Sequence, residues 1–288
     1  MIRFLALKSD NFLTNPESFG TFIGTVIQNI EKQCSRANWT MVVSVVSVQN
    51  FQEEISHLQT SQACDGTIIL GTNLTDIQLS EISSRFNNFV ILDNAAPLMD
   101  INAVSINNYQ GGHLAAEYLL QNHHNRIAYI GSKERYRNFQ ERENGFLDAL
   151  QSKHISPCST IHISQETGMA QIDFGRFLSE SAFDATAIFC ESDYMAIGVM
   201  KALSSYKLDV PNKVSVIGFD DVAESTMVTP ELTTVSVNRD ALAGLAFKRL
   251  HDMILSIDTH KAVVKQTINT TLALRNSVCF YNNLNDIM

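Results

Sequence analysis

Short, continuously apolar segments recur along this chain, and they constrain its fold more than any other feature. They lie at residues 2–7, 41–48, 67–70, 89–92, 127–130, 185–190 and 214–219. Continuous apolar runs, unlike alternating ones, are typical of strands that are covered on both faces. Segments with helical spacing lie between them, for example residues 111–121 and 193–206. Strand–helix alternation of this kind predicts an α/β fold with helices on both faces of a parallel sheet.

The length of the chain favours two such sheets over one. The sequence has 288 residues, and a domain typically has about 100–200. The segments before Gln121 and after Asn125 each have the length of a separate α/β lobe. The residues between these segments are polar, which suits a crossover from one lobe to the other.

Composition excludes several classes of protein. The net charge is −9 and no stretch concentrates Lys and Arg, so the chain is not expected to bind DNA by itself. No apolar run approaches the roughly 20 residues of a membrane helix, and the N-terminal apolar segment is too short for a signal peptide. The cysteines are odd in number and scattered, which indicates reduced thiols and a cytoplasmic protein. They are Cys34, Cys64, Cys158, Cys190 and Cys279.

Motifs for common enzyme chemistries are missing from the sequence. It contains no GxGxxG, GxxxxGK[ST], GxSxG or HExxH. His123-His124 has no further ligand at metal-binding spacing, so we interpret it as a solvated turn. Gly111-Gly112 opens a helix, where it allows either approach to a phosphate or close helix packing. No cofactor and no metal is predicted, and an enzyme is the less favoured interpretation.

The carboxyl ends of the predicted strands are the places to look for ligand chemistry, since parallel sheets bind ligands there. The residues that follow these strands are polar and rich in acids, with no evident pair of nucleophile and base. They are Gly71-Thr72-Asn73, Asp93-Asn94, Gly131-Ser132, Glu191-Ser192-Asp193 and Asp220-Asp221.

Six motifs, in order along nearly the whole chain, resemble the effector-binding core of lactose-repressor (LacI/GalR) family transcription regulators. Four are strand or helix segments, and two are short Arg-containing motifs at residues 142–146 and 275–277. The segments are 107–119, 124–131, 193–198 and the stretch 214–235 with its Val-Ser-Val-Ile-Gly-Phe-Asp-Asp and Thr-Pro-Glu-Leu-Thr-Thr-Val sequences.

The resemblance implies a periplasmic-binding-protein-like fold of type I, with two doubly wound parallel-sheet lobes, three crossovers and an interlobe cleft. Residues 1–123 and 239–266 are expected to form the N-terminal lobe, and residues 124–238 and 267–288 the C-terminal lobe. The family's helix-turn-helix headpiece is expected to be absent from this chain. The partners implied are a small polar effector, a second copy of the chain in a homodimer, and operator DNA through such a headpiece, with no membrane.

Two residues resemble the family's principal ligand contacts. Arg142 matches a cleft arginine, whose planar fork can donate two hydrogen bonds to neighbouring hydroxyls or a carboxylate. Asp220 matches a cleft aspartate, which can accept from both hydroxyls of a vicinal diol. The alternatives are a surface arginine and an aspartate that stabilises its own loop. Asp221 is expected to be a structural partner.

Further ligand contacts follow from the resemblance. Ser192 stands where many members have Asn, and Val237 where some have a polar residue, so a roomier or less polar site is expected. Asp193 matches a helix N-cap and receives a structural role. Phe22 is expected to be either an aromatic wall of the site or a core residue, and the loop before it, 9–18, is longer than the family's usual loop. The remaining candidates are Asp93 after the fourth strand, and Tyr109 and Gln110 at a helix start.

The predicted function is therefore the effector-sensing and dimerisation domain of a bacterial LacI-type regulator, with a sugar or sugar derivative as ligand. One alternative is a solute-binding protein of a transporter, which shares the fold but requires export. The other is an α/β enzyme that uses Asp220 and Asp93 as acid and base on a sugar.

Overall fold

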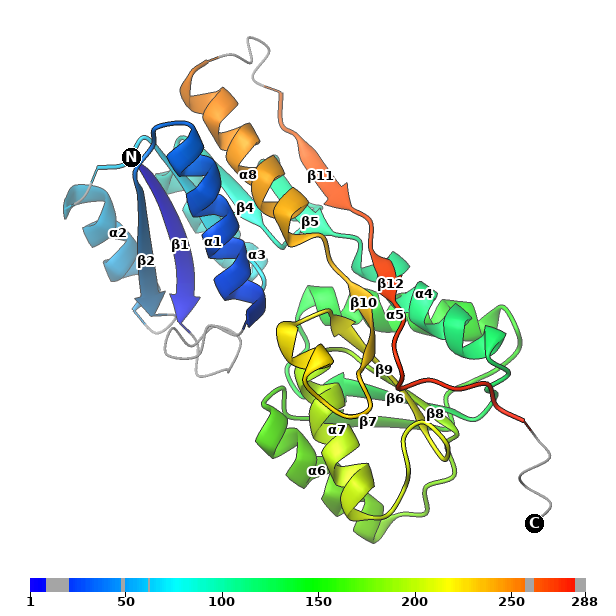
Figure 1. The fold of residues 1–288 in the computed structure, drawn as a ribbon. Coiled ribbons are helices and arrows are strands. Elements are labelled where there is room, and N and C mark those ends of the chain that lie inside the picture. Colours follow the sequence, from blue (N-terminus) through cyan, green and yellow to red (C-terminus); the bar gives the residue numbers. More distant parts are fainter. Residues whose placement is uncertain (9–20, 48–49, 62, 257–261, 283–288) are drawn as a thin grey trace. The chain divides into compact units, whose positions relative to one another are not determined.

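The computed structural model describes residues 1–8, 21–47, 50–61, 63–256 and 262–282, and the loop 9–18 lies outside this range. The chain forms two compact units, each built from two stretches of sequence (Figure 1). Unit 1 consists of Met1–Ile106 and Asn238–Ile268, and unit 2 of Asn107–Val237 and Asn269–Met288. Each unit contains a six-stranded sheet. The predicted pair of doubly wound α/β lobes is confirmed.

The sheet of unit 1 has the strand order β11-β5-β4-β3-β1-β2, and every pairing in it is parallel. Its strands are β1 (Ile2–Lys8), β2 (Met41–Ser47), β3 (Gly66–Leu70), β4 (Phe89–Leu92), β5 (Ala103–Ile106) and β11 (Lys265–Ile268). Its helices are α1 (Thr21–Arg36), α2 (Phe51–Ser61), α3 (Asp76–Arg85) and α8 (Arg239–Ile254).

Helices cover both faces of this sheet, which explains why β1, β3, β4 and β5 are fully or almost fully buried. Leu5 and Leu7 of β1 belong to a core with residues of α2 and α3, such as Ile55 and Leu79. Neighbouring residues of a strand point to opposite faces. Phe4, which is fully buried, therefore points to the other face, where α8 packs on β3, β4 and β5.

The sheet of unit 2 has the order β12-β10-β9-β8-β6-β7, in which the described pairings are parallel except β10 with β12. Its strands are β6 (Ile127–Ser132), β7 (Ser159–Ile163), β8 (Ala187–Cys190), β9 (Ser215–Asp220), β10 (Thr233–Ser236) and β12 (Thr271–Ala273). Its helices are α4 (Asn108–Gln121), α5 (Arg137–Gln151), α6 (Thr167–Glu180), α7 (Asp193–Ser205) and the short 3₁₀ helix η3 (Ala223–Thr226).

Different side chains fill the two faces of this second sheet. On one face, Phe174 of α6 and Met195 of α7 lie in an aliphatic core with residues of β6, β8 and β9. Elsewhere in the unit, an aromatic cluster joins the sheet to α5. The ring centroids of Tyr129, Phe146 and Phe189 lie 5.0–6.0 Å apart. These contacts hold α5, which carries Arg142, against the sheet.

The first crossing between the units differs from the prediction. It was expected near residues 122–125 but lies between Ile106 and Asn107, so residues 107–123 belong to unit 2. The reason is close packing of α4 on α5 (Figure 1). A Cβ atom at Gly112 would lie 1.9 Å from the carbonyl oxygen of Arg142, and one at Gly145 would lie 1.9 Å from that of Tyr109. Only glycine permits backbones to approach so closely, which makes the Gly111-Gly112 pair a packing feature.

The interpretation of His123-His124 as a solvated turn is wrong for His124. That side chain is 2% exposed, and its two ring nitrogens lie 3.0 Å from the Thr186 hydroxyl and 3.1 Å from the Cys279 carbonyl oxygen. Burial lowers the pKa of His124 to about 4, although the Cys279 carbonyl opposes the shift. His124 therefore ties the C-terminal segment of unit 2 to the sheet as a neutral side chain.

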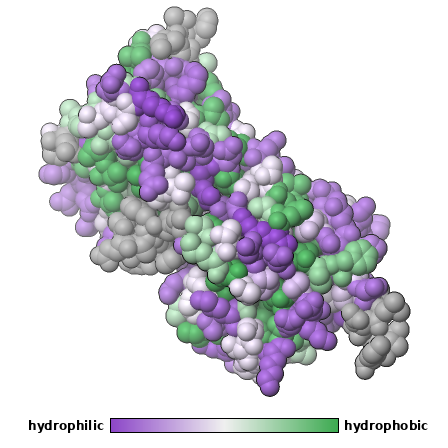
Figure 2. Space-filling model, in the orientation of Figure 1, coloured by the Kyte–Doolittle hydropathy of each residue, from purple (hydrophilic) through white to green (hydrophobic). Residues whose placement is uncertain are grey.

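Surface and thiol properties are unremarkable for a folded α/β chain. Hydrophilic residues are interspersed with smaller hydrophobic groups on the face drawn in Figure 2. No helix among the described residues is long and apolar enough to cross a membrane. The five cysteines are free thiols.

Candidate functional site

The carboxyl edge of the unit 2 sheet gathers most of the polar residues that the sequence singled out. β9 ends at Asp220, β8 is followed by Glu191 and Ser192, and β6 ends at Ser132. These three strands are neighbours in the sheet and run parallel. Their carboxyl ends therefore lie side by side, and all four residues are buried.

Arg142 of α5 lies at this edge, held by three hydrogen bonds. Its Nε donates to Oδ1 of Asn108 at 2.8 Å and its Nη1 donates to the Glu191 carbonyl oxygen at 2.6 Å. Its Nη2 lies 3.2 Å from Oδ1 of Asp220. The guanidinium carbon is also 3.6 Å from the centroid of the Phe219 ring. The structure thus brings the two principal predicted ligand residues together.

The Arg142–Asp220 pair is deeply placed, since Arg142 is 4% exposed and Asp220 8% exposed. An ion pair removed from water in this way needs further hydrogen bonds to offset the cost of desolvation. The bonds to Asn108 and Glu191 supply them, and stacking on an aromatic ring favours Arg over Lys. The guanidinium plane is consequently fixed in one orientation.

Three aspartates at or just after strand ends have a positive backbone φ angle. φ is +109° at Asp220, +53° at Asp221 and +62° at Asp93, which follows β4 in unit 1. Such conformations are uncommon for residues other than glycine, cost about 1–3 kcal/mol, and cluster at ligand-binding sites. Asp221 has a structural role, because its carboxylate accepts from Arg275 at 2.5 Å and from Ser236 at 2.8 Å.

The N-cap of α7 is Ser192, and not Asp193 as the sequence had suggested. Ser192 is the N-cap of α7 and accepts from the backbone N–H of Met195 at 3.4 Å. Asp193 is the first residue of that helix. It is fully buried and accepts from the Val222 N–H at 2.9 Å and from the Thr234 hydroxyl at 2.5 Å. Asp193 remains structural, but as a link from α7 to β10 and to the loop after β9.

The buried carboxyl of Asp193 is a poor acid. Burial, and secondarily the neighbouring charge of Asp220, raises its pKa well above the ordinary range. Gly218 makes room for this carboxyl, since a Cβ there would lie 2.1 Å from Oδ1 of Asp193.

Tyr109 and Gln110 do not join the Arg142–Asp220 cluster. Tyr109 is 42% exposed, and its hydroxyl donates to Asp148 of α5 at 2.8 Å. The side-chain amide of Gln110 is occupied by Thr270, whose N–H and hydroxyl donate to Oε1 at 2.8 and 2.9 Å. Both side chains bind other parts of unit 2, and their ligand contacts stay predictions.

The remaining predicted residues lie at other points of the two units. Val237 follows β10 and is buried. In unit 1, Asp93 is buried and accepts from the Thr72 hydroxyl at 2.6 Å. Phe22 of α1 is half-buried, with the guanidinium carbon of Arg239 5.8 Å from its ring centroid. Their ligand contacts stay predictions.

Three buried polar residues of unit 2 were missed from the sequence. Asn108 accepts from Arg142, as described above. Asn138 is buried one helical turn before Arg142, on the same face of α5. Gln165 follows β7, is 4% exposed, and has a side-chain oxygen with no hydrogen-bond partner. A buried acceptor without a donor costs about 1–3 kcal/mol. Lone amide residues of this kind carry no signal in a single sequence.

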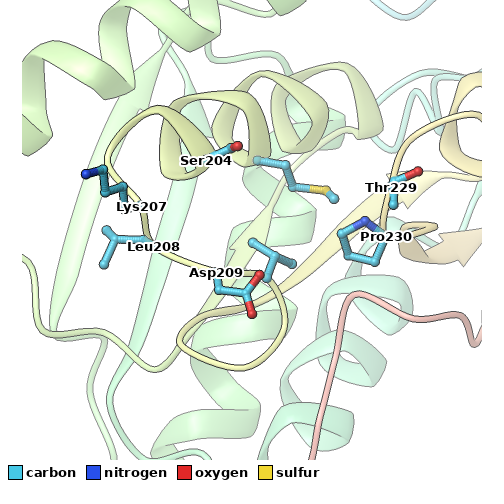
Figure 3. Close-up of a pocket in the computed structure, with 8 residues that line it drawn as sticks. Ser204, Lys207, Leu208, Asp209, Thr229 and Pro230 are labelled. Carbon is cyan, nitrogen blue, oxygen red and sulfur yellow. The ribbon is translucent and has the colours of Figure 1, made fainter.

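Two cavities among the described residues are lined by other residues than these. One, of about 260 Å³ in unit 2, is lined by residues of α7, the segment after it, and Thr229-Pro230 (Figure 3). The other, of about 320 Å³ in unit 1, lies at the amino-terminal ends of β1 and β3. No group of three or more potential metal ligands occurs in the part of the chain that the structure describes.

Comparison with known proteins gives three kinds of match. Residues 116–278 match the family described as periplasmic binding protein-like domain. An HTH-type transcriptional repressor PurR from Klebsiella pneumoniae (strain 342) is 27% identical over 270 residues, covering 86% of this chain and 76% of the relative. A probable HTH-type transcriptional repressor ExuR from Bacillus subtilis (strain 168) is 28% identical over 278 residues, covering 92% and 78%.

Solved structures agree in fold. A LacI family transcriptional regulator from Enterococcus faecium with bound ribose has a TM-score of 0.79 and 21% identity, covering 97% of this chain and 100% of that one. The transcriptional regulator CelR in complex with cellobiose has a TM-score of 0.84 and 21% identity, covering 96% and 84%.

Proposed function

The chain belongs to the periplasmic binding protein-like domain family, and on this premise we propose that it is the effector-sensing core of a LacI-type transcription regulator. The ligand is a small polar molecule, a sugar or sugar derivative, bound without being transformed. The repressors among its relatives support a regulator over the solute-binding protein of a transporter. A regulator of this kind acts in the cytoplasm.

The buried Arg142–Asp220 pair carries this proposal. Arg142 offers donors in a fixed plane and Asp220 offers acceptors beside it, 3.2 Å away. Adjacent hydroxyls of a sugar both donate and accept, so they complement such a pair. The Phe219 ring below the guanidinium keeps this plane in place.

We assign further ligand contacts around this pair. Ser192 follows Glu191, whose carbonyl accepts from Arg142, and Asn138 lies one helical turn before Arg142 in α5. The unsatisfied oxygen of Gln165 provides an acceptor for a ligand hydroxyl. The resemblance also predicts Val237 of unit 2 as an apolar ligand contact, and Asp93 and Phe22 of unit 1 as further ones. The ribose and cellobiose of the two structural relatives support a saccharide.

Regulation in this proposal follows from differential affinity. A ligand shifts an equilibrium only by the difference in its affinity for two conformations of the regulator. The regulator acts as a homodimer, and operator DNA is bound by a helix-turn-helix region and not by the two units described above.

A thermal-shift screen tests the proposal with ribose, cellobiose, other sugars, sugar phosphates, nucleosides and purines. A ligand at 100 times its dissociation constant stabilises the protein by about 2.7 kcal/mol. We expect one class to shift the wild type, Arg142→Ala to lose the shift, and the exposed-surface variant Arg176→Ala to keep it. Chromatography should recover the ligand unchanged. A shift that Arg142→Ala retains, or a ligand that is consumed, contradicts the proposal.

A further inference from the structure

A buried charge network adjoins Arg142 and is centred on Glu191. The Glu191 side chain is fully buried. It accepts from the Tyr129 hydroxyl, from the Ser132 N–H at 2.6 Å, and from Nη1 of Arg135 at 2.8 and 2.9 Å. An isolated carboxylate in such a place would be very costly, so its stability depends on Arg135.

The same residue holds Arg142 through its backbone. The carbonyl oxygen of Glu191 accepts from Nη1 of Arg142 at 2.6 Å. The next residue in the chain is Ser192, the N-cap of α7. The position of the Glu191 side chain therefore determines where two proposed ligand contacts lie.

Arg135 also reaches the helix that carries Arg142. Its Nη2 lies 2.5 Å from Oε2 of Glu143, the residue after Arg142 in α5. One guanidinium thus joins the end of β8 to α5, the helix from which Arg142 donates to the Glu191 carbonyl oxygen. Lys, with a single ammonium group, could not bridge both carboxylates with the same geometry.

We infer that Arg135 is a positioning residue for ligand binding. It ties the end of β8 to α5 and thereby fixes the guanidinium of Arg142. The inference rests on the proposed function for its effect on affinity, but the effect on Arg142 itself does not require a ligand. Misplacing a binding group by about 1 Å is enough to lower affinity or rate by large factors.

Nuclear magnetic resonance of the ¹⁵N-labelled protein without ligand provides the test. The side-chain N–H signals of Arg142 are assigned by their loss in Arg142→Lys, and their hydrogen exchange is then measured. We expect slow exchange in the wild type, exchange at least about tenfold faster in Arg135→Met, and wild-type exchange in Lys133→Met. Lys133 is a matched control, because it lies in the same loop but pairs with Asp173.

A double variant separates positioning from simple charge compensation. Glu191→Gln removes the buried charge that Arg135→Met leaves without its cation. If Arg135 positions α5, the double variant regains thermal stability while Arg142 still exchanges fast. If the double variant restores both stability and slow exchange, or if Arg135→Met leaves the exchange unchanged, the inference is wrong. Should Arg135→Met not fold, Glu143→Gln decides: its side chain is 24% exposed, and unchanged Arg142 exchange in it overturns the inference.

Ligand affinity tests whether the position of Arg142 affects binding. With ribose, cellobiose or another sugar that shifts the wild type, Arg135→Met should bind at least about tenfold more weakly, and Lys133→Met normally. If no compound in the screen binds the wild type, the proposed function fails while the exchange rates still decide the role of Arg135.

Discussion

Replacing Gly112 by alanine tests the packing that places Arg142. A Cβ there would lie 1.9 Å from the Arg142 carbonyl oxygen, whereas real Cβ contacts are essentially never below 3.0 Å. Helices α4 and α5 would have to move apart by about 1 Å, since the new Cβ is fixed to the backbone of α4 and the oxygen belongs to the backbone of α5. Overpacking of this kind costs about 1–3 kcal/mol, and we take the upper value. The higher helix propensity of alanine returns about 1 kcal/mol, so the free energy of unfolding should fall by about 2 kcal/mol.

Thermal unfolding followed by circular dichroism measures this change. One kcal/mol corresponds to about 2–4 °C in a domain of about 150–250 residues, so Gly112→Ala should lower Tm by about 4–8 °C. Sugar affinity should fall with it, because α5 carries Arg142. Gly175→Ala in α6 is the matched control. Its new Cβ would meet Tyr206 at an ordinary 3.9 Å, and helix propensity should raise Tm by about 2–4 °C. A Gly112→Ala protein as stable as the wild type would refute the close-packing argument.

Three further predictions concern unit 2. Gly218→Ala should lower the free energy of unfolding by about 2–3 kcal/mol in urea titrations, because its Cβ would collide with the Asp193 carboxyl; an unchanged midpoint would contradict this. Arg142→Lys should bind sugar at least about tenfold more weakly in calorimetry, because Lys cannot donate to three acceptors in one plane. Equal affinity would show that the planar guanidinium is not required for binding. His124 has a pKa of about 4 when folded and an ordinary value near 6.5 when unfolded. The unfolded state therefore binds more protons in this interval, and stability should fall by up to about 3 kcal/mol as pH drops from about 6.5 to about 4. Urea titrations at both pH values should show a smaller loss in His124→Gln, and an equal loss would exclude His124 as the cause.

Sequence patterns revealed the strands with long apolar runs, but they missed five shorter or more polar ones: β5, β7, β10, β11 and β12. Residues 89–92 were predicted as a strand and form β4. β7 was missed because it lies at a sheet edge and its residues alternate between half-buried and exposed. β12 was missed because it is short and half-exposed, and its position depends on antiparallel pairing with β10. Both need knowledge of neighbours that lie far away in sequence.

The candidate site shows a similar division. The resemblance to regulator cores pointed to Arg142 and Asp220, and the structure places them 3.2 Å apart. It also suggested Tyr109 and Gln110, whose side chains bind Asp148 and Thr270 in the structure and whose ligand contacts stay predictions. Position at a helix start does not determine where a side chain points when a neighbouring helix packs as closely as α5 does.

The network around Glu191 could not be found from sequence for a different reason. A glutamate after a strand is ordinarily solvated, and its neighbour Arg135 lies 56 positions away in the chain. Complete burial of Glu191 depends on how β6, β8 and α5 come together. Tertiary structure alone reveals such a charge pair.

In the proposed function, unit 2 recognises a small polar ligand through Arg142 and Asp220 without changing it. Isothermal titration calorimetry with the sugar selected by the screen, on wild type, Arg142→Ala and Asp220→Asn, tests it most directly. We predict saturable binding with one site per chain in the wild type, at least about a tenfold loss in each variant, and intact sugar afterwards. Undiminished binding in both variants, with each protein folded, would contradict the account.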